Sequence, residues 1–140
     1  MRPTLMLMAM IAAPAMAAPA PRWTAVGAGA GGGAIEIDRG SLNWRPLQRA
    51  WWRIHYAPAK ADGTVEERHL ELVDCSSGES AVIETVSLDS AGRVIADQRD
   101  GEELAAQRMD PPTPGTAGET VVEGACRLRP PPPPPRRKRR

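Results

Sequence analysis

The chain has 140 residues, among them two cysteines, two histidines and no phenylalanine. This length suits a single domain and is too short for a TIM barrel or a complete two-half Rossmann enzyme. Lys and Arg total 18 against 17 Asp and Glu, but residues 127–140 carry seven of the cations, whereas residues 18–126 carry a net charge of −7. We therefore predict an acidic body followed by a basic tail.

Residues 1–17 have the pattern of a signal peptide. An arginine follows the initial methionine, Leu5–Ile11 is apolar, and Ala15–Ala17 fits the small-residue cleavage rule. The alternative, a membrane anchor, requires about 20 apolar residues, and a proline interrupts this run much earlier. We predict export to the periplasm or cell surface, with a mature chain that begins near Ala18 and has no following cysteine for a lipid anchor.

If the protein is exported, its two cysteines, Cys75 and Cys126, most simply form a disulfide, because the compartments outside the cytoplasm are oxidising. Closing so long a loop contributes roughly 4 kcal/mol in a chain-entropy estimate. The alternative is a metal site, but there is no CxxC motif, and His55 and His69 lack ligand spacing. We predict no metal and no cofactor.

Alternating apolar and polar residues predict a series of strands separated by Gly-containing turns, which favours an antiparallel meander. In the strongest of them, Trp52 and Ile54 share one face while Trp51 and His55 share the other. The predicted strands are Trp23–Val26, Ala34–Asp38, Gln48–Ala57, Glu66–Cys75, Ala81–Leu88 and a last one that starts at Arg93–Ala96, with a turn or single helical turn over Asp38–Leu42.

The glycine-rich segment Gly27–Gly33 matches the GxGxxG pattern of dinucleotide-binding proteins. That function needs a helix to begin at the glycines, so that the helix N-terminus holds the pyrophosphate. Here the next segment, Ala34–Asp38, has strand alternation instead. We therefore predict a hairpin loop.

The C-terminal part of the body is predicted to be a helix. Asp97–Asp110 is polar, and we expect a mobile loop or short helix there. Thr116 and Glu119 then fit a capping box. Apolar residues at helical spacing follow, and Cys126 lies near the helix end, where a disulfide to Cys75 would attach the helix to the sheet. The predicted apolar helix positions are Val121, Val122, Ala125 and Leu128.

Residues 129–140 are predicted to be a disordered tail. Pro130–Pro135 form a polyproline rod without backbone donors, and five cations follow it. Such a tail has the charge to bind lipopolysaccharide phosphates, anionic lipid, a sulfated glycan or the acidic body of a neighbouring copy. The alternative is an unstructured end that only makes the protein more soluble. Nucleic acid is disfavoured, because no aromatic residue interleaves the basic run. The candidate anion-binding residues are Arg136, Arg137, Lys138, Arg139 and Arg140.

No arrangement of residues indicates catalysis, and we predict a protein that is not an enzyme. His55 and His69 are isolated strand residues, and Ser76 and Ser77 lack a nucleophile-elbow pattern. An acidic group in the loop region lacks EF-hand spacing, so a solvated surface is the simpler explanation. Its members are Asp97, Asp100, Glu102, Glu103 and Asp110.

Adjacent Trp51 and Trp52 must point to opposite faces of their strand. If a helix covers only one face of the sheet, one tryptophan remains exposed or lies in an interface. This is an indication of homodimerisation through the uncovered face.

Short motifs distributed over residues 23–128 carry a family resemblance. They are, in chain order, Trp23, Ile35–Asp38 with Ser41–Leu42, Trp51–Trp52, Val73–Cys75, Pro111–Gly115 and Glu123–Cys126. With this order and these cysteine positions, the chain resembles the surface-adhesin protein E family of small exported bacterial proteins. The resemblance covers nearly all of the predicted domain, residues 18–128.

The resemblance implies an α+β fold, an antiparallel sheet of about six strands with a C-terminal helix tied to it by a disulfide. It also implies an adhesin-like domain that binds host or matrix proteins and can dimerise. The chain departs from the family in having no lipoprotein cysteine, a glycine-rich first loop and a proline-rich basic end. The alternative function is a periplasmic envelope-associated module whose basic tail docks on anionic lipid or glycan.

Overall fold

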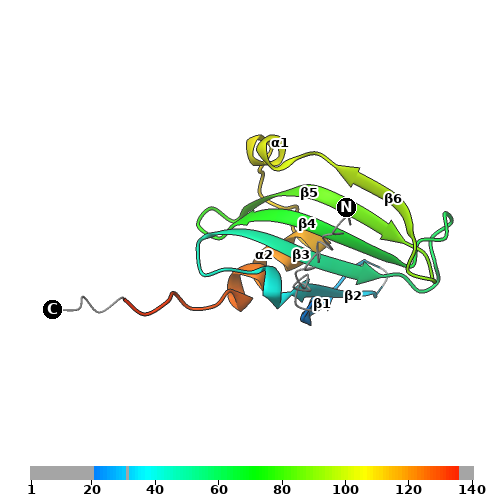
Figure 1. The fold of residues 1–140 in the computed structure, drawn as a ribbon, viewed down its shortest axis with the longest axis horizontal. Helices are drawn as coiled ribbons and strands as arrows, with labels where there is room; N and C mark the ends of the chain where they lie inside the picture. Colours follow the sequence, from blue (N-terminus) through cyan, green and yellow to red (C-terminus); the bar gives the residue numbers. More distant parts are fainter. Residues whose placement is uncertain (1–20, 31, 136–140) are drawn as a thin grey trace, which may run out of the picture.

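A computed structural model describes residues 21–30 and 32–135. The expected signal peptide and the cations at 136–140 lie outside these residues. Six strands form one antiparallel sheet in chain order, so each strand pairs with the next (Figure 1). The strands are β1 (Trp23–Ala28), β2 (Ala34–Asp38), β3 (Leu47–His55), β4 (Glu66–Asp74), β5 (Glu79–Leu88) and β6 (Val94–Arg99).

The meander follows from alternation on the strands and from turn residues between them. Buried and more exposed side chains alternate along β3, as the sequence predicts for a sheet with two different faces. Glycines with positive φ occupy the tight turns, among them Gly63 at 89° and Gly92 at 74°. A hairpin connection joins β1 to β2 as predicted, but it begins at Gly29, because Gly27 and Ala28 belong to β1 and pair with Ile35 and Ala34. A 3-10 turn, η1 (Arg39–Ser41), follows β2.

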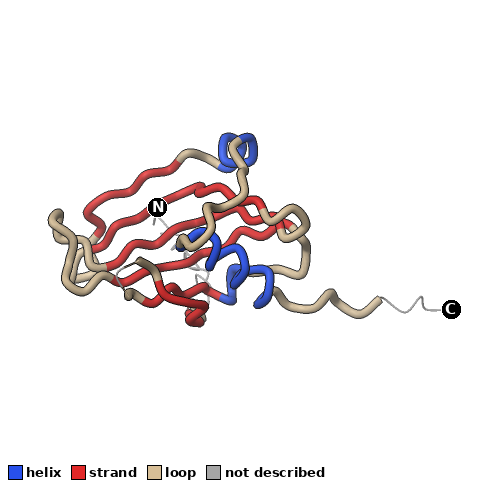
Figure 2. The backbone as a smooth tube through the Cα atoms, turned by 180° about the vertical axis from the view of Figure 1, so that it is seen from behind, coloured by secondary structure: helices blue, strands red, loops and turns tan. Residues whose placement is uncertain are grey.

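One face of the sheet is covered by helix α2 (Ala117–Leu128), which crosses β1, β2 and β3 (Figure 2). Val121 and Ala125 on α2 are fully buried, as predicted, and they pack on Ile35, Ile37 and Trp52 of the sheet. A disulfide between Cys75, just after β4, and Cys126 attaches the end of this helix to the sheet. The predicted antiparallel sheet with a stapled C-terminal helix is confirmed.

Gly124 lets α2 approach the sheet closely. A Cβ atom at this position would lie 2.8 Å from Val26 Cγ1 and 3.0 Å from Ile37 Cδ1, distances at which atoms overlap. The helix therefore lies on β1 and β2 at a separation that only glycine permits.

The opposite face carries a smaller core at one end. Leu70 and Leu72 point to this side and pack with Ile83 and with Ala105 of a short helix, α1 (Glu102–Gln107). Of the alternatives expected for Asp97–Asp110, the short helix is thus the one observed. In the part of the chain that the structure describes, no helix combines the length and apolar character that crossing a membrane requires.

Two sequence-based details are wrong. Asp97–Arg99 belongs to β6 rather than to a loop, because its backbone continues the pairing with β5. Thr116 is the N-cap of α2, but its hydroxyl donates to the carbonyl of Thr113, and Glu119 accepts from the backbone N–H of Gly115. The turn that contains Pro114 and Gly115 thus supplies the partners that a capping box would have supplied.

Candidate functional site

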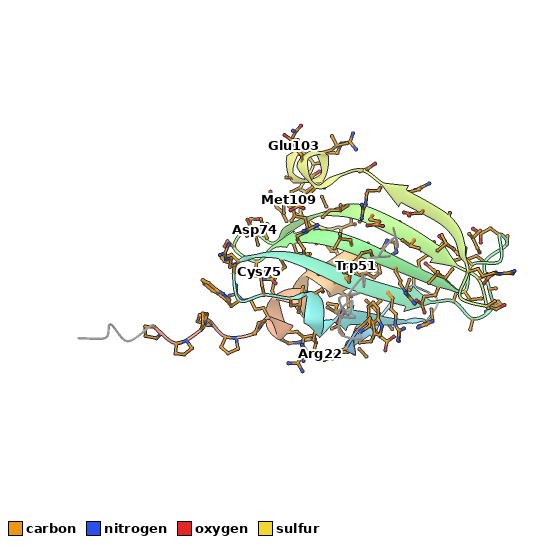
Figure 3. The ribbon with its side chains drawn as sticks, in the orientation of Figure 1. Arg22, Trp51, Asp74, Cys75, Glu103 and Met109 are labelled. Carbon is orange, nitrogen blue, oxygen red and sulfur yellow. A yellow bond between two sulfur atoms is a disulfide. The ribbon has the colours of Figure 1, made fainter. Side chains whose placement is uncertain are left out.

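The candidate site lies on the sheet face opposite α2, which we call the open face. It is the face seen in Figure 3, where the labelled Trp51 lies near its centre. Trp23 on β1 pairs with Asp38 on β2, and Ile37 pairs with Trp52. Residue alternation therefore aligns Trp23, Asp38 and Trp51 in one row across three strands of this face.

These residues line a hollow of about 270 Å³. Asp38 Oδ1 accepts hydrogen bonds from the backbone N–H groups of Arg22 and Gly40, both at 2.8 Å, so its carboxylate is fixed in place. Two indole groups beside a fixed carboxylate and a guanidinium give a surface with both apolar and charged contacts. The lining residues are Pro21, Trp23, Asp38, Trp51 and Arg68.

An ion-pair network extends from the hollow along the open face. Arg53 Nε lies 2.7 Å from Glu36 Oε2, and Arg53 Nη1 lies 3.7 Å from Glu66 Oε2. Glu66 also pairs with Arg68 and lies 3.4 Å from the Nδ1 atom of His55. Arg53 and Glu66 are largely shielded from solvent, with side chains 20% and 11% exposed. Each charge has an opposite partner, so the network is rigid and close to neutral.

Arg53 also connects the network to the hollow. Its guanidinium lies 4.5 Å from the ring centroid of Trp23, which is cation–π distance. The orientation of Trp23 is therefore held by a residue that is itself held by Glu36 and Glu66. Tryptophan and arginine residues in fixed positions are the typical energetic centres of protein interfaces.

The other histidine belongs to a separate polar cluster on the α2 side of the sheet. The ring of His69 stacks on Trp52 at a centroid distance of 4.0 Å, and its Nδ1 lies 3.0 Å from Thr85 Oγ1. Burial lowers the pKa of His69, although nearby Glu67 opposes the shift. The imidazole is therefore a packed sheet residue, consistent with the interpretation from the sequence.

Two glutamates in this region have pKa values shifted in opposite directions. Glu71 is 3% exposed, and burial raises its pKa, although Trp52 Nε1 donates to its carboxylate at 2.6 Å. Burial alone would also raise the pKa of Glu67, but hydrogen bonds from Lys60 and Tyr56, each 2.6 Å, bring it below the ordinary value. Glu71 was missed by sequence reasoning, because alternation alone does not show which charged residue is buried.

The remaining candidate residues from the sequence are distributed over the molecule. His55 and His69 lie on opposite faces, so they form no joint site. Ser76 and Ser77 lie in the exposed turn between β4 and β5. The predicted acidic group is exposed on β6, α1 and their connections, and no group of metal-binding side chains occurs among residues 21–30 and 32–135. The cations Arg136–Arg140 lie outside the described residues.

Comparison with known proteins adds no identification. No family model, no curated protein and no solved structure matches the chain. The resemblance to the surface-adhesin protein E family therefore remains a prediction from the residues.

Proposed function

We propose that the protein is an exported, non-enzymatic binding domain and that its open face recognises a protein partner, with adhesin-like binding of a host or matrix protein as the most specific form. The observation that carries this proposal is the Trp23–Trp51 hollow beside the Arg53 network. These aromatic and charged side chains are fixed by neighbours and are not covered by α2.

Export is part of the proposal. The signal-like pattern of residues 1–17 supports it, and so does the disulfide between Cys75 and Cys126, because disulfides persist in oxidising compartments. In the first experiment, intact cells are treated with protease and the body of the protein is detected, with a periplasmic protein as control. Cleavage while the control stays intact is the expected result for a surface protein. Protection would refute the adhesin-like form.

The second experiment tests the open face directly. Binding of the purified protein to immobilised extracellular-matrix proteins is measured for Trp51→Ala and for Trp44→Ala, a tryptophan substitution outside this face. A central interface tryptophan contributes about 2 kcal/mol or more, so we expect Trp51→Ala to weaken binding roughly thirtyfold. Equal loss in both variants, or none in either, would remove the open face from the proposal.

A second copy of the chain is an alternative occupant of the open face. Sedimentation at several concentrations distinguishes it, since a dimer that uses this face should dissociate in the Trp51→Ala variant. A monomer at all concentrations would leave the face free for a different protein.

A second proposed function concerns the segment after α2. Pro130–Pro135 are exposed and outside any helix or strand, and in Figure 1 they extend away from the domain. This geometry supports a tail that carries its cations to an anionic lipid or glycan surface. Deleting residues 129–140 tests it, because binding that survives belongs to the body and binding that disappears belongs to the tail.

A further inference from the structure

Four consecutive residues, Trp44–Leu47, are exposed at the end of the domain where α2 ends (Figure 1). Trp44 is 45% exposed and Leu47 is 48% exposed, although the neighbouring Leu42 and Gln48 are buried. Two large apolar side chains, Trp44 in the loop and Leu47 at the start of β3, therefore face solvent. Exposed apolar groups gathered in this way indicate a binding surface.

The exposure is built into the loop. The fully buried side chain of Gln48 accepts a hydrogen bond from the backbone N–H of Asn43 at 2.9 Å and also bonds to the carbonyl of Arg45. Asn43 Oδ1 accepts from the backbone N–H of Arg45 at 2.7 Å. These bonds hold the loop on both sides of Trp44, so its outward position is fixed.

The end of α2 lies against the same loop. The backbone N–H of Cys75 donates to the carbonyl of Pro46 at 3.0 Å, and Cys75 is bonded to Cys126 in the last part of α2. The loop and the end of the helix together border a hollow of about 560 Å³ that is open to solvent. It is lined by Trp44, Pro46, Cys126, Arg127, Arg129 and Pro130–Pro132.

Positive charge surrounds these apolar groups. Arg45, Arg127 and Arg129 are all exposed. None of them has a carboxylate within 4.0 Å among the described residues, whereas six other arginines of the domain form ion pairs. Five more cations follow in the sequence at 136–140. This end of the molecule therefore combines unneutralised arginines with an exposed tryptophan and leucine.

We propose that this end of the domain, formed by Trp44, Arg45, Leu47, Arg127 and Arg129, docks on an anionic lipid bilayer. The proposal rests on the second proposed function and gives it a lipid target and an apolar anchor within the folded body. Tryptophan prefers the bilayer interface, and arginines near the surface are attracted to anionic headgroups. Leu47 favours lipid over glycan, because an aliphatic side chain gains from burial among acyl chains and has no partner on a hydrated sugar.

Vesicle binding tests the proposal with protein purified from the cells that make it. Co-sedimentation is measured with phosphatidylcholine vesicles and with vesicles that contain phosphatidylglycerol. We expect binding to the anionic vesicles only. Trp44→Ser should weaken it about tenfold, which is the effect of losing partial burial of an indole. The Arg127→Ala/Arg129→Ala variant should weaken it roughly twenty-five-fold, about fivefold for each cation.

Control positions come from the far end of the sheet. Val94, the first residue of β6, is 60% exposed, and Arg93 in the turn before it has a side chain that is 81% exposed and pairs with Asp89. Val94→Ser and Arg93→Ala should bind within about twofold of the original protein.

Fluorescence quenching tests whether Trp44 itself enters the bilayer. Brominated phosphatidylglycerol should quench the fluorescence of Trp44 in the original protein. The conservative variant Trp44→Phe should still bind the vesicles, but this quenching should disappear.

The outcomes separate this inference from the tail proposal. If Trp44→Ser binds vesicles normally while neutralising residues 136–140 abolishes binding, the body anchor is refuted and tail docking stands. If neither change affects binding, both fail. Preferential binding to soluble heparin, unaffected by Trp44→Ser, would identify a glycan target and overturn the lipid assignment.

Discussion

Removing the disulfide should greatly destabilise the fold. In the original protein, the disulfide closes a loop between two positions 51 residues apart, and this loop persists in the unfolded chain. The Cys75→Ala/Cys126→Ala variant loses this constraint. The chain-entropy relation gives about 4 kcal/mol of lost stability for a loop of this length. At roughly 4 °C per kcal/mol for a domain of this size, the melting temperature should fall by about 15 °C.

Urea unfolding monitored by circular dichroism measures this loss. The unfolded state of the variant is less compact and exposes more surface, so the slope of free energy against urea should increase while the midpoint falls. The original protein unfolded in the presence of a reductant is the control and should match the variant. A loss below about 1 kcal/mol would refute the argument, because it would mean that the packing of α2 alone holds the helix on the sheet.

Three further predictions concern side chains in the body. Gly124→Ala should lower stability by about 1 kcal/mol, because overlap with Val26 outweighs the helix propensity of alanine. Gly118→Ala in the same helix, where the nearest atom is 3.4 Å away, is the control, and equal effects would contradict the close approach. Because burial raises the pKa of Glu71, ionising its carboxyl group costs stability as pH rises above 4.5. In thermal melts, Glu71→Gln should therefore become more stable relative to the original protein as pH rises above 4.5. A pH-independent difference would refute this. Because burial lowers the pKa of His69, stability should decline as pH falls below 6.5, and a decline of the same size in His69→Gln would assign it to other groups.

The fold was largely predictable because its elements are locally encoded. Alternation, β-branched residues and Gly-containing turns together marked six strands, whose ends differ from the structure by up to three residues. The apolar spacing of Val121, Val122 and Ala125 marked the face of α2 that packs on the sheet. The cysteine pairing was predicted from the expected export and from the presence of only two cysteines. In each case the deciding information lay within a short segment or a count.

The candidate site was much less predictable because it depends on register. The sequence placed Trp51 and Arg53 on one face of a strand, but nothing local indicated that Trp23 would lie under the Arg53 guanidinium. That contact requires three strands to pair at particular positions. The predicted capping box of α2 was wrong for a related reason. Glu119 accepts from the backbone N–H of Gly115, which lies just before the four-residue pattern from which the box was predicted.

The adjacent tryptophans of β3 connect the core to the candidate site. Trp52 is buried beneath α2 and donates to Glu71, whereas Trp51 lies on the open face, and its backbone N–H donates to Ser41 Oγ at 2.9 Å. A register slip of one residue would place Trp51 in the core, but it would also turn Arg53 into the core, away from the Glu36 carboxylate with which it pairs on the open face. The cost of burying that unpaired guanidinium opposes the slip. The charged neighbour of the two tryptophans therefore keeps Trp51 on the open face.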